Sequence, residues 1–197
     1  MNKTSLIIAL MAPSVLFAQE TRELGAHEHG HSALNIAIEG GQVAIELQAP
    51  GADIVGFEYE AKTAEDRAKL DAAIAALSKP LSLFVLPAAA GCTVAASSAG
   101  LIDEHHKEGE DHAHDDHDHD HDDHDDHAKE DGAEHTEFHA EYLLNCSDPD
   151  AINRIEFAFF KTFPNAQEVD VQMISDRGAQ GFEVERDAPV LDLSGSI

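Results

Sequence analysis

The sequence predicts an α+β fold with a mainly antiparallel sheet and one helix, interrupted by a disordered His/Asp-rich loop. Three observations lead to this prediction. Two alternating apolar runs are joined by Gly40-Gly41, one later stretch has helical spacing, and the middle of the chain lacks large apolar residues. Alternation with period two is typical of strands that bury one face, and further runs of this kind follow the middle segment.

The first two strands are predicted to form a hairpin. The alternating apolar positions are Leu34, Ile36 and Ile38 in the first run, and Val43, Ile45 and Leu47 in the second. A Gly-Gly pair between two such runs is a signal for a tight β-turn.

A helix is predicted over residues 63–78. Thr63 and Asp66 have the spacing of a capping box, and Pro80 lies just beyond the predicted end. The apolar residues at helical spacing are Leu70, Ile74 and Leu77.

The remaining apolar runs predict further strands, about seven in all with the hairpin. Buried strands are expected at 81–86 and 92–97, an alternating strand at 138–144, and strands at 169–173 and 182–193, while residues 155–160 form a further apolar run. The aromatic residues in and after the run at 155–160 are predicted to be core: Phe157, Phe159, Phe160 and Phe163.

The first residues have the pattern of a signal peptide, residues 1–18. Lys3 precedes an apolar run that is too short to span a bilayer, and small residues lead to a cleavage site after about Ala18. The alternative is a buried N-terminal helix. Export predicts a periplasmic protein whose residues 19–197 form a single α+β metal-binding domain, with the His/Asp-rich insertion at about 103–134.

Cys92 and Cys146 are the only cysteines, and an exported chain meets an oxidising compartment. A disulfide is therefore predicted, and it would fasten the two stems of the insertion together. The alternative is a pair of metal thiolates, which the absence of a CxxC spacing makes weaker.

The formal net charge of −27 is concentrated in the insertion, where sixteen acidic residues between Asp103 and Glu134 face only Lys107 and Lys129. Such a field repels nucleic acid and anionic membranes and attracts cations. The insertion lacks any large apolar residue, so a disordered loop is expected when no metal is bound.

The insertion interleaves these carboxylates with histidines, which are predicted to bind metal: His105, His106, His112, His114, His117, His119, His121, His124 and His127. Imidazole is a ligand for zinc, copper and nickel, whereas carboxylate alone suits calcium and magnesium. Many overlapping ligand sets predict several ions held at modest affinity, as in capture or buffering. The alternative is a solvated acidic segment or a tag.

A second group of histidines is predicted to belong to the folded domain: His27, His29, His31, His135 and His139. The first three alternate, so an extended chain places them on one polar face, opposite Leu34. If their strand lies near that of His139, a fixed site forms between them. The alternative is a set of scattered surface histidines.

The sequence resembles the ZrgA family of exported zinc-uptake proteins with a central His-rich insertion. The residues that carry the resemblance, in order, are Ala26-His27-x-His29-Gly30, Ala33-Leu34-Asn35, Pro50, Val55-Gly56-Phe57-Glu58, Leu86-Pro87-Ala88, Cys92, the insertion, Phe138-x-Ala140-x-Tyr142, Cys146, Phe159-Phe160-x-x-Phe163-Pro164 and Val169-x-Val171-Gln172.

This resemblance implies a periplasmic protein that assists zinc acquisition beside the solute-binding protein of a zinc ABC transporter. The family's N-terminal histidine pair corresponds to His27 and His29. Relatives often have histidine after the Gly-Phe-Glu segment, where this chain has Tyr59, so an ordered site that used that position is depleted or rebuilt, with His31 as a candidate.

The predicted function is capture of Zn²⁺ by the loop and the histidine cluster for transfer to a partner, without enzymatic activity. The sequence has no Gly-x-Ser-x-Gly elbow and no Gly-rich phosphate loop. Two alternatives stay open: a buffer or detoxifier for excess zinc, copper or nickel, and a zinc-dependent hydrolase.

Overall fold

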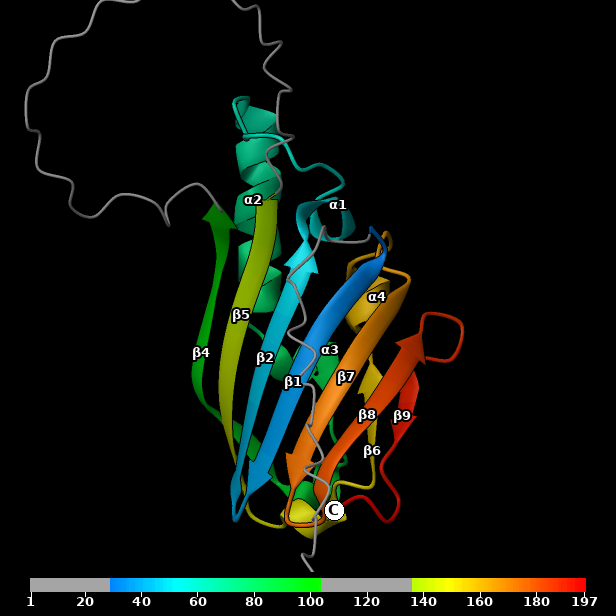
Figure 1. Ribbon diagram of the computed structural model, residues 1–197. Helices are drawn as coiled ribbons and strands as arrows, with labels where there is room; N and C mark the ends of the chain where they lie inside the picture. The colour runs from blue at the N-terminus through cyan, green and yellow to red at the C-terminus, as the bar shows by residue number, and fades with distance from the viewer. Residues whose placement is uncertain (1–28, 104–135) are drawn as a thin grey trace, which may run out of the picture.

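The computed structural model describes residues 29–103 and 136–197, and a six-stranded sheet dominates it (Figure 1). The strand order across this sheet is β4-β5-β2-β1-β7-β8. The strands are β1 (His31–Glu39), β2 (Gln42–Pro50), β4 (Cys92–Asp103), β5 (Thr136–Cys146), β7 (Glu168–Ser175) and β8 (Gly178–Glu185).

Three antiparallel pairs along the chain, β1–β2, β4–β5 and β7–β8, lie side by side to make this sheet. β2 pairs with β5 in the antiparallel sense, and β1 pairs with β7 in the parallel sense. The α+β class with a mainly antiparallel sheet is thereby confirmed. The parallel pair joins the start of the described chain to a strand near its end.

Helices and a smaller sheet cover one face of the large sheet (Figure 1). The helices are α1 (Gly51–Ile54), α2 (Ala64–Leu77), α3 (Pro80–Leu83) and α4 (Phe159–Thr162). The three-stranded sheet has the order β3-β6-β9, formed by β3 (Phe84–Val85), β6 (Arg154–Phe157) and β9 (Val190–Asp192). Two 3₁₀ turns, Ala88–Ala90 and Pro149–Ala151, complete the described elements.

The core lies between these two layers. Leu34, Leu47 and Val169 on the large sheet are buried, as are Phe84 and Phe157 on the small one. Each such side chain contributes about 1.5–3 kcal/mol on burial. The predicted core aromatics are all buried, and the ring centroids of Phe84 and Phe157 lie 5.4 Å apart, edge to face.

The predicted hairpin and helix are confirmed. β1 and β2 are joined through Gly40, whose φ of 55° is in the left-handed region that glycine adopts without strain. At the start of α2, the hydroxyl of Thr63 accepts a hydrogen bond of 3.0 Å from the Asp66 backbone N–H. This is the N-cap that the sequence predicts.

Two predicted strands are wrong in part. Residues 81–86 form the end of α3 and the two residues of β3, because Pro80 at the first helical position favours a helical turn. The apolar run at 155–160 divides between β6 and α4, because a short apolar run is compatible with either strand or helix. Residues 182–193 divide between β8 and β9, since the chain turns before Pro189 into the small sheet.

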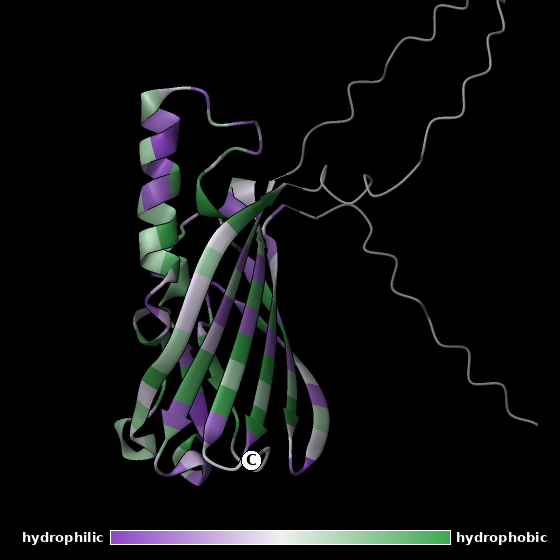
Figure 2. Ribbon diagram, turned by 90° about the vertical axis from the view of Figure 1, so that its left-hand side faces the viewer, coloured by the Kyte–Doolittle hydropathy of each residue, from purple (hydrophilic) through white to green (hydrophobic). Residues whose placement is uncertain are grey.

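The other face of the large sheet carries no helix or strand within the described ranges, and Figure 2 shows the helices on one side of it. Along β1, β2, β5 and β7 buried residues alternate with less buried ones. We call the second set the open face. Within the described ranges, the positions of this face in β1, β2, β5, β7 and β8 hold no Lys or Arg. They hold eight acidic residues, of which only Glu137 is buried: Glu39, Glu46, Glu137, Glu141, Glu168, Asp170, Glu183 and Glu185.

Cys92 and Cys146 form the predicted disulfide, between residues directly opposite each other on β4 and β5. It lies at one end of this strand pair. At the other end Asp103 pairs with Thr136, and the insertion joins these two residues. The stems of the insertion are therefore held by strand pairing where they begin, and the disulfide closes the opposite end.

Candidate metal centre

The histidines of the described chain gather at the end of the sheet where β1, β5 and β7 begin. β1 and β7 align there at His31 and Glu168, and β2 and β5 align at Pro50 and Glu137. We call this region the insertion end, because Asp103 and Thr136 lie in it too.

Among the described helices, none has both the length and the apolar character that a membrane span requires.

Asp53 fixes the start of β1 at the insertion end. Its carboxylate accepts a hydrogen bond of 2.7 Å from the Gly30 backbone N–H and one of 3.4 Å from the Ser32 hydroxyl. Gly30 has a φ of 95°, a backbone conformation that residues with a side chain adopt only with strain. Its backbone N–H is buried and therefore needs a hydrogen-bond acceptor. Burial raises the pKa of Asp53, and the bond from Gly30 opposes that rise.

His29 lies in the turn just before β1 and pairs with Glu58, which follows α1. The distance from His29 Nε2 to Glu58 Oε2 is 3.0 Å, within the normal range of a charge-assisted hydrogen bond. This bond raises the pKa of His29. The His29 side chain is 63% exposed and that of Glu58 is 13% exposed, so a solvent-accessible imidazole pairs with a mostly buried carboxylate.

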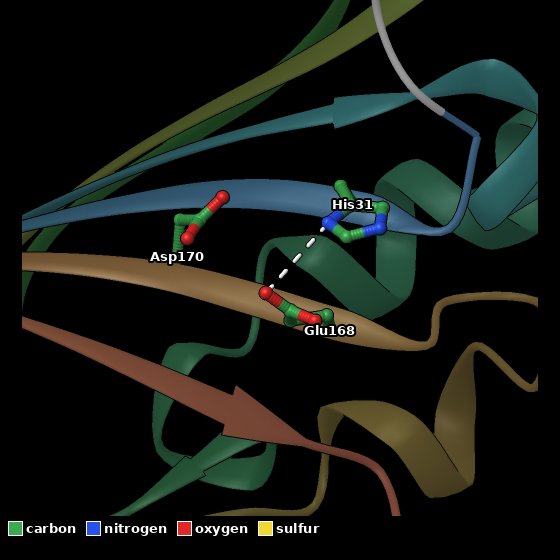
Figure 3. A group of neighbouring side chains, drawn as sticks. All are labelled: His31, Glu168 and Asp170. Atoms are coloured by element: carbon green, nitrogen blue, oxygen red, sulfur yellow. Dashed lines mark ion pairs between the residues drawn. The ribbon is translucent and has the colours of Figure 1, made fainter.

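His31, Glu168 and Asp170 form the one group of three or more metal-donor side chains found within the described residues. One donor atom from each side chain lies within 4.8 Å of the other two. His31 Nδ1 and Glu168 Oε1 are 3.7 Å apart, and the side chains are 37% and 24% exposed. All three project from the open face of the β1–β7 pair (Figure 3).

His139 lies on the open face of β5 and contacts Glu137 on the same strand through Nε2 and Oε2. A carboxylate on one ring nitrogen fixes the tautomer and leaves the other nitrogen as a potential ligand. β2 separates this pair from β1, with Gln48 directly between His139 and Ala33.

The structure thus places three of the predicted domain histidines at one end of the sheet without joining them in one ligand cluster. β1 and β5 are two strand spacings apart, roughly 10 Å. His27, His135 and the nine loop histidines lie outside the described residues. Tyr59 stacks on Phe57 with ring centroids 4.6 Å apart, and its hydroxyl reaches Asp66 at 3.5 Å.

The carboxylates were not predicted from the sequence as parts of a site. Glu168 and Asp170 alternate with buried residues on β7, so the sequence shows that they share a polar face. It does not show which strand lies beside them. Only the parallel pairing of β1 with β7 sets them beside His31. Asp53 has a weaker signal still, a single acidic residue in an apolar segment.

A broad groove of about 970 Å³ lies farther along the open face. Small side chains such as Ala37, Ala44 and Ala96 line it, together with the carboxylates of Glu46 and Glu141. Among the described residues that line it there is no histidine, so its donors differ from those at the insertion end.

The donors at the insertion end are imidazole nitrogens and carboxylate oxygens, both of which bind Zn²⁺ at about 2.0–2.2 Å. They are partly exposed, and acidic residues surround them. Such an arrangement attracts divalent cations and leaves them accessible for exchange.

Comparison with known proteins agrees with this chemistry. A family model described as the ZrgA family zinc uptake protein matches residues 26–193. The match spans both strands that bear the metal donors, the insertion and both cysteines. Among curated proteins, none matches the chain. By the extent of the family match, the chain belongs to the ZrgA family of zinc uptake proteins.

Proposed function

We propose that this protein is a periplasmic accessory protein for zinc acquisition, which captures Zn²⁺ through the His/Asp-rich loop and the histidines of the insertion end and passes it on. The family supports a role in zinc uptake. The pattern of residues 1–18 supports export, and a disulfide suits an oxidising compartment.

One observation carries the proposal. The two chain segments that bear the remaining histidines both join the described domain at the insertion end: one precedes His29, and the other connects Asp103 to Thr136. Ligands on the loop and ligands on the sheet are therefore tethered to the same region, and a tether raises their effective concentration for each other.

The mechanism that follows has two stages. Many weak loop sites collect the scarce ion, helped by a segment whose negative charge draws cations toward it. Histidines and carboxylates on the sheet then hold it in a fixed position, from which a partner removes it. The partner we propose is the solute-binding protein of a zinc ABC transporter. Copper and nickel compete for the same imidazoles, so supply must favour zinc.

Calorimetric titration with zinc at pH 7.5 tests the proposal, comparing the mature chain with a variant in which a short turn replaces residues 104–134. Because Asp103 and Thr136 are paired, a tight turn can close β4 and β5. We expect several weak sites to vanish and at least one tighter site to remain. Loss of all binding contradicts the two-stage mechanism.

The direction of metal flow needs a second experiment. Transcript levels are measured in cells under zinc chelation and under zinc excess. Uptake predicts induction by chelation. Induction by excess zinc contradicts uptake and favours a buffer for surplus zinc, copper or nickel.

A further inference from the structure

We infer that His31, Glu168 and Asp170 are the protein ligands of a zinc site on the folded domain, built across the parallel pair of β1 and β7. The inference rests on the proposed function and names the site from which the captured ion is passed on.

The spacing of the donors favours a metal site over a simple ion pair. At 3.7 Å, His31 Nδ1 and Glu168 Oε1 are too far apart for a hydrogen bond with each other. Two ligands of a tetrahedral zinc with bonds of 2.0–2.2 Å lie about 3.3–3.6 Å apart. A shift of a few tenths of an ångström brings this pair to ligand spacing.

The other two histidines of the insertion end differ in this respect. The donor atoms of His29 and Glu58 are at hydrogen-bond distance, and those of His139 and Glu137 are closer still. An ion cannot lie between donor atoms that already contact each other, so each pair must separate before both its members bind zinc. The donor atoms of His31 and Glu168, at 3.7 Å, are not in such direct contact with each other.

Strand register supplies the third ligand. Glu168 is directly opposite His31, and Asp170 is two residues farther along the same face, opposite Ala33. Ala33 has no side chain beyond Cβ, so the Asp170 carboxylate can reach toward His31 over it. Figure 3 shows the three side chains at the start of the β1–β7 pair.

The local charge also favours a cation. Glu168 and Asp170 lie opposite Glu185 and Glu183 of β8, so four carboxylates lie on the two strands that follow β1 across this side of the sheet. Arg186 follows Glu185 in the chain, but its guanidinium donates to the Ala166 carbonyl. Zinc would therefore offset a cluster of negative charge as well as complete its ligand set.

Three protein donors leave a fourth tetrahedral position open. A ligand from a partner could take that position before the three protein ligands leave, so transfer would not require release of the ion to water. This property distinguishes a transfer site from a closed structural site of four protein ligands.

The test uses the full mature chain. Zinc chloride is titrated by calorimetry, and hydrogen–deuterium exchange is followed with and without zinc for peptides that cover β1 and β7. The variants are His31→Ala, Glu168→Gln and Asp170→Asn. Glu141→Gln is the matched control, because it removes one charge from an exposed position of the same face on β5.

We expect zinc to slow exchange in β1 and β7 of the wild type and of Glu141→Gln. Each ligand variant should lose that protection and weaken one site at least about tenfold, since removing even an outer partner of a metal ligand typically lowers affinity 10–100-fold. The isosteric Glu168→Gln and Asp170→Asn separate a lost ligand from a lost fold.

Two outcomes overturn the inference. If zinc binds but protection in β1 and β7 is absent, the loop binds zinc and this site does not exist. If the ligand variants retain both protection and affinity, other residues hold the ion. Failure of the wild type to bind zinc at all contradicts the proposed function itself.

Discussion

The backbone N–H of Gly30 donates a 2.7 Å hydrogen bond to the buried carboxylate of Asp53, and this bond sets the position of β1 where its histidines begin. Gly30 lies between His29 and His31, so the contact orients both. Asp53 of α1 thus fixes the turn that carries these histidines. The sequence pointed to this region only through the histidines themselves.

Replacing Asp53 tests this relationship. Asp53→Ala leaves the buried Gly30 N–H without its acceptor and should lower the free energy of unfolding by about 1–3 kcal/mol. It should also weaken the tightest zinc site, because the turn that carries His29 and His31 loses its anchor. Urea unfolding and zinc calorimetry measure the two effects. Unchanged values of both would show that the turn is fixed by other contacts.

Asp53→Asn is the matched control, because the amide oxygen still accepts from Gly30. Burial raises the pKa of Asp53, so the folded protein binds its proton more tightly than the unfolded chain does. Wild-type stability from this group therefore falls as pH rises from the ordinary value of 3.8 through the raised pKa. The amide introduced by Asp53→Asn does not titrate, so the variant should gain stability relative to wild type over that window.

The sequence predicted the local structure well where a short stretch decides it. The hairpin around Gly40 and the Thr63 cap depend on neighbouring residues, and both were confirmed. At Pro80 the failure concerns a short apolar run, which is compatible with either strand or helix, and before Pro189 it concerns a turn that divides the predicted strand between two sheets.

The candidate site was predictable only in its histidines. Imidazole-rich spacing is visible in any sequence, whereas the carboxylates depend on which strand neighbours β1. A parallel partner far along the chain supplies Glu168 and Asp170. The expected juxtaposition of His31 with His139 remains a prediction, with β2 lying between their strands.

The disulfide should contribute to stability without contributing to zinc capture. Cys92 and Cys146 lie at the end of β4 and β5 opposite the insertion, 54 residues apart in sequence. The chain-entropy model gives roughly 4 kcal/mol for a loop of that length, as an upper figure. The double variant Cys92→Ser/Cys146→Ser should show that loss in urea, while calorimetry shows unchanged zinc stoichiometry. A changed stoichiometry in the folded variant would contradict this separation.

The N-cap of α2 gives a local test of the fold. Thr63→Ala removes the hydroxyl that accepts from the Asp66 N–H and should lower the free energy of unfolding by about 1 kcal/mol. Thr63→Ser keeps the acceptor and should retain most of the stability. Urea unfolding of both variants measures the difference, and equal losses would assign the effect to the lost methyl group instead.

Tyr142 links the sheet to α2, and its effect should depend on pH. Its buried hydroxyl donates a 2.8 Å hydrogen bond to the Leu77 carbonyl at the end of α2, so Tyr142→Phe should cost about 0.5–1.5 kcal/mol at pH 7. Burial raises the pKa of Tyr142 above its ordinary value of 10.

Above pH 10 the unfolded chain releases this proton and the folded protein keeps it, so wild-type stability falls with rising pH. The Tyr142→Phe variant has no phenolic proton to release at this position. Its stability deficit should therefore shrink between pH 8 and pH 11, values chosen to bracket the ordinary tyrosine pKa of about 10. Urea unfolding at both pH values measures it. A deficit that stays constant would mean that the hydroxyl ionises equally in the folded and unfolded states.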